Sequence, residues 1–418
     1  MIIRELRLLD FRLFQDSTFS FSPRVTVIAG INGRGKTSIL DAIALILARW
    51  LPEISPAESL TRKMSRKDIR SGEYGARIWL NASVGDNPVT LSTKTGYTPS
   101  SGQMFILPRA LKDELRRAYG DPTRSDDQAP IVVYYTTDRA RYQAPRRTLL
   151  VPRLNQTDAY VGALSNRAVS FKEFIPLFHT WEGADERGES QAIRRAQRLI
   201  PAIQRAVSTF LDEIQNIRTE GYPPRLVVTK QGSTLNLAQL SDGERSLIAM
   251  LMDLIRRLTL ANPGLDDPLQ GAGVVLIDEI ELHLHPKWQR EIVEKLRRTF
   301  PRIQFILTTH SPFVIQSTHS SSELILLDAQ PLDQLENKGV EEIAKTLMGV
   351  ERPEVSMRYQ DMRAAARSYL ELLNEASLAP ETKLAQYKER LAEAISPYAD
   401  NPAFQAFLEM KRAAALGE

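Results

Sequence analysis

The chain has 418 residues, of which 43% are hydrophobic and 25% are charged, and this composition is typical of a soluble globular protein and argues against an intrinsically disordered one. Its 54 lysines and arginines nearly balance 51 aspartates and glutamates, so the net charge of +3 gives no general argument for nucleic-acid binding. The chain has no cysteine, which excludes disulfides and thiolate metal sites.

The N-terminal residues show no pattern of a targeting or membrane segment. Residues 1–11 carry charges every few positions, unlike a signal peptide. The longest apolar run, residues 42–48, is too short to cross a bilayer. We therefore expect a cytoplasmic protein that makes no contact with a membrane.

A glycine-rich segment, GINGRGKTS at residues 30–38, follows the strand-like run at residues 25–29 and precedes a helix-like run. It matches the phosphate-loop pattern GxxxxGK followed by Ser or Thr, in which glycines let backbone N–H groups approach phosphate oxygens. Lys36 is expected to bind the β and γ phosphates and Thr37 to ligate Mg²⁺. The alternative is a glycine turn with an incidental lysine, which the strand–loop–helix context makes much less favoured. The predicted nucleotide-binding residues are Gly30, Asn32, Gly33, Arg34, Gly35, Lys36, Thr37 and Ser38.

The region from residue 55 to residue 217 contains strand-like runs and then helix-like ones. Residues 77–80 and 89–92 read as strands, and the polar segments after them, rich in Gly, Pro and Ser, are typical of loops. Residues 131–133 form another strand-like run, and residues 171–217 carry apolar side chains at helical spacing. We expect a β-rich lobe with mobile insertions, followed by a helical lobe.

The segment LAQLSDGERSLIAML introduces a long helix. Apolar residues recur after it at helical spacing, and Ser241 with Glu244 three positions later forms a capping-box pattern. A serine hydroxyl, free N–H groups and Gly243 together could also bind an anion. A plain capping box is the alternative, and helix physics alone favours it.

Two further strand-like runs end in polar side chains. Residues 274–277 are followed by Asp278 and Glu279, which at the carboxyl end of a parallel strand suit Mg²⁺ binding and activation of a water molecule. Residues 303–307 are followed by His310, which could donate a hydrogen bond to a γ phosphate. The alternatives are a helix N-cap for the acidic pair and an ordinary structural role for the histidine.

The C-terminal part of the chain is predicted to be helical. Apolar residues recur at spacings of three and four over residues 340–347, 357–376, 381–395 and 402–416. These helices could pack on the rest of the chain or bind a partner.

Two groups of arginines could track the phosphates of DNA or RNA, although most charge runs are solvated faces. The two groups are Arg139, Arg141, Arg146, Arg147 and Arg153, and Arg194, Arg195, Arg198 and Arg205.

The pair His283 and His285 could bind a metal, but no third ligand is evident.

Four of these segments together resemble the ABC-type ATPase head of the SMC/RecF/OLD group. Residues 30–37 are similar to its Walker A, 240–244 to its LSxGE signature, 274–279 to its Walker B, and His310 to its switch histidine. The resemblance implies an α/β P-loop NTPase fold, with a mixed sheet flanked by helices, a helical lobe and a C-terminal helical tail. It also implies ATP and Mg²⁺ as cofactors and hydrolysis of ATP to ADP and phosphate.

The resemblance further implies a dimer in which two copies sandwich ATP. The signature of one copy would close on the nucleotide held by the Walker A of the other. The glutamine loop of the family is not identifiable, and residues 134–139 are only a positional candidate. The implied roles are catalytic for Glu279 and His310, metal-binding for Thr37 and Asp278, and nucleotide-binding for Ser241, Gly243, Glu244 and, after the first strand, Arg12.

The motifs suggest four parts of the chain. An N-terminal ABC lobe with Walker A and a β-rich insertion would occupy residues 1–150, and a helical lobe residues 151–238. A C-terminal ABC lobe with the signature, Walker B and the switch histidine would occupy residues 239–330, and a partner-binding helical tail residues 331–418.

Two absences narrow the resemblance. No long heptad run separates Walker A from the signature, which excludes SMC-type arms, and no DxD at a strand end follows residue 327, so the chain itself is not expected to cut DNA. The patterns at residues 339–354 and 400–412 resemble compact ATPases that are paired with an HNH-type nuclease in Septu-like and retron-linked anti-phage systems. The alternative is a RecF-like, ATP-gated DNA-binding protein, and a transporter motor is disfavoured by the spacing of Walker A and signature.

Overall fold

The fold is seen in a computed structural model of the chain. It describes residues 1–54, 62–84, 87–96, 129–140, 156–165, 175, 178–179, 182, 191–327, 342–343, 357–378, 380–398 and 401–416. The chain divides into two compact units, residues 1–349 and 350–418.

A parallel sheet of five strands forms the centre of the first unit. Its order is β12-β3-β11-β10-β6, and every neighbouring pair is parallel. All residues of β3, β6, β10 and β11 are buried, as expected for parallel strands that are covered on both faces. The predicted strands that begin at residues 25, 131, 274 and 303 are confirmed. Their bounds are β3 Val25–Ala29, β6 Ile131–Tyr135, β10 Gly273–Ile277, β11 Ile303–Thr309 and β12 Leu324–Leu326.

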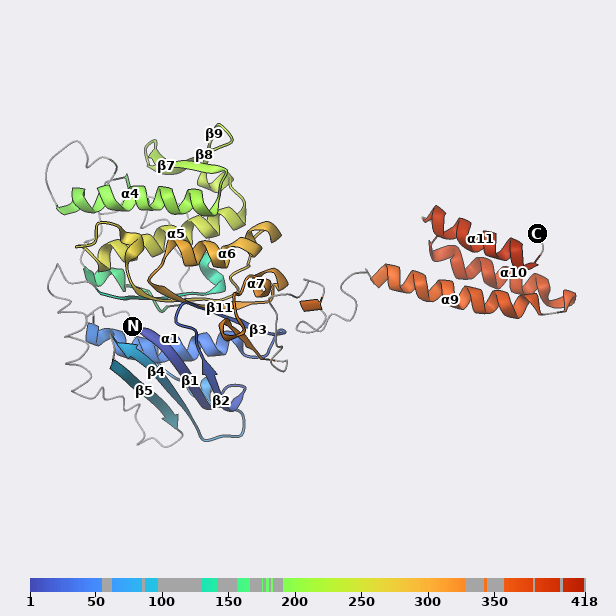
Figure 1. Cartoon of the computed structure of the whole chain (residues 1–418), viewed down its shortest axis with the longest axis horizontal. Coiled ribbons are helices and arrows are strands. Elements are labelled where there is room, and N and C mark those ends of the chain that lie inside the picture. The colour runs from blue at the N-terminus through green and yellow to red at the C-terminus, as the bar shows by residue number, and fades with distance from the viewer. Residues whose placement is uncertain are drawn as a thin grey trace. The chain divides into compact units, whose positions relative to one another are not determined.

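Helices cover both faces of this sheet (Figure 1). The helix α1 (Lys36–Ile54) lies on one face, between the parallel sheet and a four-stranded antiparallel sheet. The helices α5 (Asp242–Ala261) and α6 (Pro286–Thr299) lie on the other face. The α/β class is therefore confirmed, with the parallel and antiparallel strands in separate sheets. The antiparallel sheet has the order β2-β1-β4-β5, with bounds β1 Ile2–Phe11, β2 Phe14–Ser20, β4 Gly75–Val84 and β5 Asn87–Gly96.

A third sheet stands where helix was expected. The helix α4 (Gln191–Phe210) is followed by the antiparallel strands β7 (Ile214–Glu220), β8 (Arg225–Lys230) and β9 (Ser233–Asn236). Extending the helix to residue 217 was wrong for residues 214–217. Ile214 and Ile217 have helical spacing, but the register with β8 shifts between Gln215 and Arg218, so both isoleucines are buried on a strand.

A buried charge cluster joins α5 to the sheet. Asp253 accepts hydrogen bonds from the Tyr135 hydroxyl at 2.9 Å and from Arg257 Nε at 2.6 Å, and it pairs with Arg256 at 3.1 Å. Burial by itself would raise the pKa of Asp253, but the charges and hydrogen bonds of Arg257 and Arg256 lower it to about 2. Asp253 is therefore ionised at neutral pH, and α5 is tied to the carboxyl end of β6.

The described residues of the second unit form three α-helices, α9 (Met357–Ser377), α10 (Glu381–Ile395) and α11 (Pro402–Leu416). These match three of the four helices predicted in this region, and of the fourth only residues 342–343 are described, as helix. The side chains of Tyr369, Leu373, Leu391 and Leu408 form the core of the unit.

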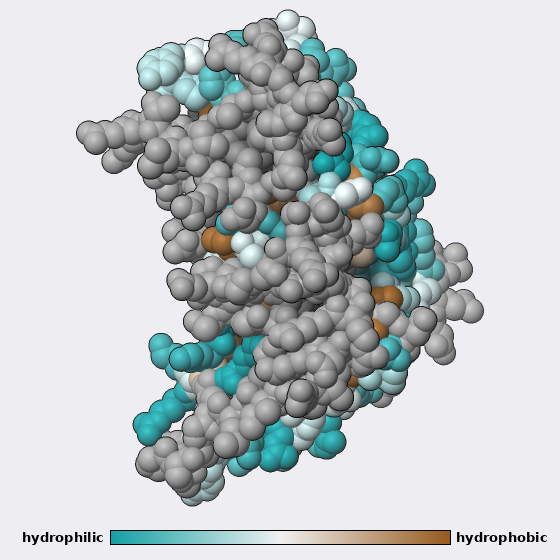
Figure 2. Space-filling view, turned by 90° about the vertical axis from the view of Figure 1, so that its left-hand side faces the viewer, coloured by the Kyte–Doolittle hydropathy of each residue, from teal (hydrophilic) through white to brown (hydrophobic). Residues whose placement is uncertain are grey.

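The described surface is mixed in polarity. On the face shown in Figure 2, the hydrophobic residues among those coloured form small, separate patches between hydrophilic ones. None of the helices in the described part of the chain combines the length and the apolar character needed to cross a membrane.

Candidate functional site

Four neighbouring parallel strands bring the predicted residues to one edge of the sheet. The strands β3, β11, β10 and β6 are adjacent, and each carboxyl end leads into a polar segment. In open α/β sheets, ligands bind at the carboxyl ends of the strands. The segments that meet there are residues 30–38, 308–311, 278–281 and 136–139.

The loop after β3 has the shape of a phosphate cradle. Gly33 and Gly35 have φ angles of +83° and +94°, which favour glycine. A Cβ on Gly35 would lie 2.7 Å from Cζ of Phe14, so no larger residue fits there without movement of that ring. The 19-residue helix α1 begins at Lys36, directly after the loop, and its N-terminal N–H groups favour an anion.

Lys36 is held at the mouth of this loop. Its ammonium group donates to the carbonyls of Gly30 and Ile31, at 2.7 and 2.9 Å, and lies 3.2 Å from Nδ1 of His310. Because an ammonium group has no acceptor, Nδ1 must accept, which leaves the proton of a neutral imidazole on Nε2. That Nε2 atom lies 4.0 Å from Oε1 of Glu279.

The acidic residues after β10 face the same loop. The Thr37 hydroxyl lies 3.1 and 3.0 Å from the two carboxylate oxygens of Asp278, and the Thr308 hydroxyl donates to Asp278 at 2.6 Å. A hydroxyl and a carboxylate that meet beside a phosphate loop are the oxygen ligands that Mg²⁺ prefers, so these donors fit the ion.

One pocket of about 250 Å³ collects these side chains. The predicted residues Arg12, Gly30 and Arg34 are not among its lining residues, whereas Leu13, which was not predicted, is. The lining residues are Leu13, Asn32, Gly33, Gly35, Lys36, Thr37, Ser38, Asp278, Glu279 and His310.

Arg12 lies beside the loop but is engaged by carboxylates. Its guanidinium pairs with Asp41 at 2.7 Å and with Asp68 at 2.9 Å, and a longer contact of 3.4 Å reaches the Ser38 hydroxyl. Burial acts to lower the pKa of Arg12, but the hydrogen bonds and charges of the two aspartates raise it. The guanidinium of Arg12, which contacts Ser38 at the end of the loop, therefore also binds α1 through Asp41.

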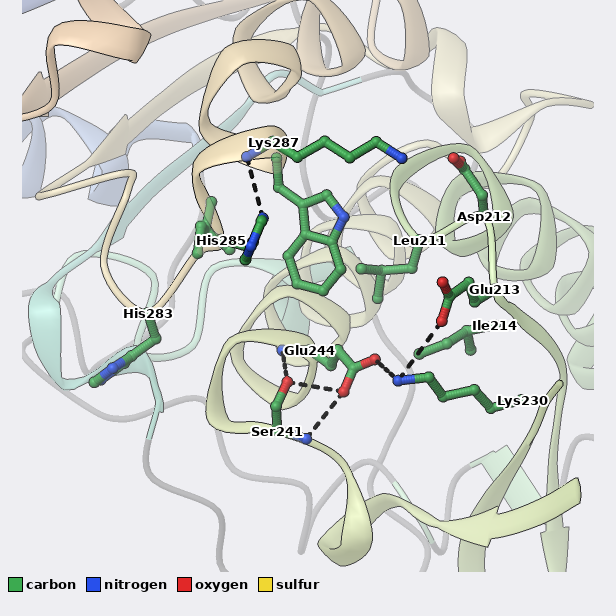
Figure 3. Close-up of a pocket in the computed structure, with 12 residues that line it drawn as sticks. Leu211, Asp212, Glu213, Ile214, Lys230, Ser241, Glu244, His283, His285 and Lys287 are labelled. Atoms are coloured by element: carbon green, nitrogen blue, oxygen red, sulfur yellow. Dashed lines mark hydrogen bonds and ion pairs between the residues drawn. The ribbon is translucent and has the colours of Figure 1, made fainter.

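Two of the signature residues, Ser241 and Glu244, line a different pocket, of about 610 Å³, and Gly243 is not among the lining residues of either pocket (Figure 3). Ser241 caps α5, with its hydroxyl accepting from the Glu244 N–H at 3.3 Å and donating to the Glu244 carboxylate at 2.8 Å. Lys230 donates to the same carboxylate at 2.7 Å. Burial would raise the pKa of Glu244, but the hydrogen bonds from Lys230 and Ser241 lower it. The capping box is thus present, and the predicted residues fall into two groups within one copy.

Gly243 allows α5 to touch the loop that follows the acidic strand. A Cβ at this position would lie 2.2 Å from the backbone oxygen of His283. The start of α5 and the acidic loop are therefore in direct contact. The same loop also contacts the end of β11, because Glu281 accepts from the N–H of His310 at 2.5 Å and from the Thr309 hydroxyl at 2.7 Å.

Replacing Gly243 by alanine is expected to destabilise the protein by about 1–3 kcal/mol, because either α5 or the His283 backbone must move. Urea unfolding measures this loss. Asp242→Ala, at the neighbouring exposed position of the helix, is the control; it removes a surface ion pair with Arg245 and should cost less than about 1 kcal/mol. Equal effects of the two substitutions would contradict the close approach.

Some residues of the site were not predicted in these roles. Thr308 donates to Asp278, and Glu281 accepts from the N–H of His310. Both residues lie at or just after the ends of parallel strands, so these roles could have been inferred from their positions in the sequence. Arg139 was named among the arginines that could track phosphates, and its burial contradicts this for Arg139. It is 4% exposed and donates to the backbone oxygens of Asp278 and Glu279.

Of the other arginines in the two groups, only Arg198 and Arg205 have described side chains, so the phosphate-tracking surface stays a prediction. Arg198 donates to the carbonyl of Leu265, and Arg205 pairs with Asp267. The positions 141, 146, 147 and 153 and the side chains at 194 and 195 lie outside the described part of the chain. The described residues also contain no group of three His, Cys, Asp or Glu side chains that could hold a metal, so His283 and His285 find no third ligand there.

Tyr134 and Tyr135, at the start of the positional candidate for the glutamine loop, are buried inside β6. Only the turn at residues 136–139 is left as a candidate for the glutamine loop. This turn lies beside the nucleotide pocket, where Arg139 contacts the backbone of Asp278 and Glu279, and it contains no glutamine.

Comparisons with known proteins agree with this geometry. Residues 25–316 match the family model AAA_21, described as "AAA domain, putative AbiEii toxin, Type IV TA system". The chain is 29% identical to "Retron Vc95 probable ATPase" of Vibrio cholerae, over 78% of this chain and 73% of that protein, and 26% identical to "Retron Ec83 probable ATPase" of Escherichia coli, over 78% and 72%. It is also 26% identical to "Septu protein PtuA" of Bacillus mycoides, over 78% of this chain but 39% of that longer protein.

Among solved structures, the SMC head domain from Thermotoga maritima aligns with a TM-score of 0.41 and 18% identity, over 76% of this chain and 93% of that one. The resemblance to compact ATPases of the retron-linked and Septu-like kind is confirmed by the sequence similarities.

Proposed function

The chain belongs to the AAA_21 family of AAA domains, and from this membership we propose that it binds ATP with Mg²⁺ and hydrolyses it to ADP and phosphate. We propose further that hydrolysis takes place between two copies of the chain and regulates a partner protein. One observation carries the proposal: the phosphate loop, Asp278, Glu279 and His310 line a single pocket.

The roles of the pocket residues follow from their chemistry. The loop amides and Lys36 bind the phosphates, and Lys36 exchanges its carbonyl partners for phosphate oxygens. Thr37 and Asp278 hold Mg²⁺, which supplies charge neutralisation on the phosphates when bound. Glu279 accepts the proton of the attacking water. His310, whose proton lies on Nε2, donates to the terminal phosphate.

The separation of the two pockets supports a site built from two copies. Ser241 lines the second pocket and not the one that contains Lys36, so we infer that it completes the nucleotide site of a neighbouring copy. Its hydroxyl and the N-terminal N–H groups of α5 can then bind the terminal phosphate from the side opposite the loop. Closure of the pair depends on ATP because ATP binds more tightly to the closed form.

Mixing two inactive variants tests the shared site. Lys36→Ala removes the phosphate lysine and keeps the signature, whereas Ser241→Arg blocks the signature and keeps the loop. A mixed pair contains one intact site, formed by the loop of the second variant and the signature of the first. Random pairing at equal amounts should restore about one quarter of the wild-type ATPase activity.

Each variant alone is expected to be inactive, and thermal unfolding must show that both are folded. Two folded variants that stay inactive after mixing would contradict the shared site. ATP hydrolysis by the wild type would still support a nucleotide site within each copy.

We also propose that the chain acts in anti-phage defence, as the ATPase subunit beside an HNH-type nuclease. The names of its relatives, which refer to retrons and Septu, support this role. The three-helix unit of residues 357–416 offers a surface for the nuclease, because α11 exposes Phe407 at 44% and Met410 at 61%, one turn apart on one face.

Negative charges introduced on this face of α11 are expected to weaken binding of the nuclease. We would co-express the chain with the product of the adjacent gene and purify the chain by an affinity tag. The double substitution of Phe407 and Met410 by aspartate should reduce recovery of the nuclease at least about tenfold, since it places charges in an apolar contact. Glu409→Gln, on the same helix, is the control. Full recovery with the double variant would exclude this face as the contact.

A further inference from the structure

Arg139 is a buried arginine at the edge of the nucleotide pocket. It lies in the short helical turn of residues 137–140 after β6, and 4% of it is exposed. Its guanidinium donates to the backbone oxygens of Asp278 and Glu279, both at 2.5 Å, and more weakly to Thr136 at 3.3 Å. The two short bonds come from different nitrogens, so the planar group grips two successive peptide units.

Those peptide units flank the proposed catalytic carboxylate. Glu279 has a φ of +46°, a left-handed conformation that is unfavourable for residues other than glycine and must be held by its surroundings. Its N–H donates to the Thr308 hydroxyl at 2.8 Å, and its carbonyl accepts from the Leu282 N–H at 2.9 Å as well as from Arg139. Arg139 is the charged member of this set.

Arg139 remains a cation at neutral pH. Burial lowers its pKa to about 10, against the opposing effect of the charges of Asp278, Glu281 and Glu279. A charged donor forms stronger hydrogen bonds to carbonyl oxygens than a neutral one does. The buried charge is thus placed where it fixes the backbone of the acidic pair.

We propose that Arg139 is a positioning residue for ATP hydrolysis, whose guanidinium holds the backbone around Glu279 so that the carboxylate faces the nucleotide pocket. The inference rests on the proposed ATPase function. Arg139 is not among the residues that line the pocket with Lys36 and Thr37, so it acts through Glu279 and not on the nucleotide. Its loss should therefore slow catalysis and leave nucleotide binding intact.

Arg139→Lys keeps the charge but cannot bind two carbonyls in a fixed plane. We expect kcat to fall about 10- to 100-fold, as for other residues that orient a catalytic group, while Kd for ATP changes less than about threefold. The matched control is Arg24→Lys, since Arg24 donates to the carbonyl of Arg297 away from the site. The control should keep kcat within about twofold of the wild type.

A double-mutant cycle separates positioning from a general structural role. If Arg139 acts through Glu279, Arg139→Lys should cause no further loss of hydrolysis in a Glu279→Gln background. A multiplicative loss, or a loss of ATP affinity with unchanged kcat, would overturn the proposal. Absence of hydrolysis by the wild type would instead refute the proposed function, so the two failures are distinguishable.

A second variant covers the possibility that the lysine distorts the turn. Arg139→Ala leaves a space for free guanidinium, and millimolar guanidinium should raise its kcat at least about fivefold, while equal concentrations of methylammonium or sodium chloride should not. Guanidinium should leave the Arg24→Lys control unchanged. A folded Arg139→Ala variant with wild-type kcat, or one that no guanidinium concentration rescues, would contradict the proposal.

Discussion

Replacing Glu279 by glutamine is expected to reduce ATP turnover by about 10²- to 10⁴-fold while leaving ATP bound. The amide has nearly the size of the carboxylate but cannot accept the proton of the attacking water. Arg139 donates to the backbone carbonyl of this residue and Thr308 accepts from its N–H, so neither bond involves the side chain and the variant should keep the loop conformation. With ATP and Mg²⁺ present, the variant should accumulate as a dimer, which light scattering detects.

The control is Glu291→Gln, because Glu291 lies on α6 and pairs with Lys295 at the surface. It should hydrolyse ATP at the wild-type rate and remain monomeric after the nucleotide is consumed. Normal turnover by Glu279→Gln would show that another group activates the water. A variant that traps ATP as a monomer would instead contradict the two-copy site.

Replacing Asp253 by alanine is expected to destabilise the first unit by about 3–5 kcal/mol, the usual cost of removing one partner of a buried ion pair. The side chains of Arg257 and Tyr135 would lose the acceptor that they share. Urea unfolding with a spectroscopic signal from this unit measures the loss. Asp212→Ala, at an aspartate whose side chain is 69% exposed, is the control and should cost less than about 1 kcal/mol.

The same carboxylate predicts a dependence of stability on pH. The pKa of Asp253 falls from an ordinary value of 3.8 to about 2 in the folded chain, so the folded state binds this proton less readily than the unfolded state does. Its contribution to stability is complete above about pH 5 and is lost as the pH falls through about 4 toward 2. Asp253→Asn should lack this part of the acid dependence. An identical acid profile for wild type and variant would show that Asp253 does not titrate as described.

The central sheet and most of the nucleotide pocket could be predicted because both depend on local patterns. Apolar runs at residues 25–29 and 274–277 are buried on both faces, and a buried parallel strand needs no alternation. The polar residues that follow such strands must meet at one edge of the sheet. The sequence could therefore predict that Lys36, Asp278 and His310 lie close together, as they do in one pocket.

Other features depend on contacts that spacing does not encode. The bulge in β7 places two isoleucines three residues apart on one side of a strand, which imitates a helical pattern. Arg139 looked like part of a basic surface because a charge run does not reveal which of its members is buried against backbone carbonyls. The division of the predicted residues between two pockets likewise requires three-dimensional information.

The contact between Gly243 and His283 joins the start of α5, which we propose completes the nucleotide site of a second copy, to the loop that follows Glu279. Only three residues separate Glu279 from His283, so we expect a shift of the helix start to reach the acidic residue. Binding or hydrolysis at one nucleotide should therefore alter the rate at the other, and we expect turnover by the wild type to rise as a steeper than hyperbolic function of ATP concentration, while the single intact site of a mixed pair remains active.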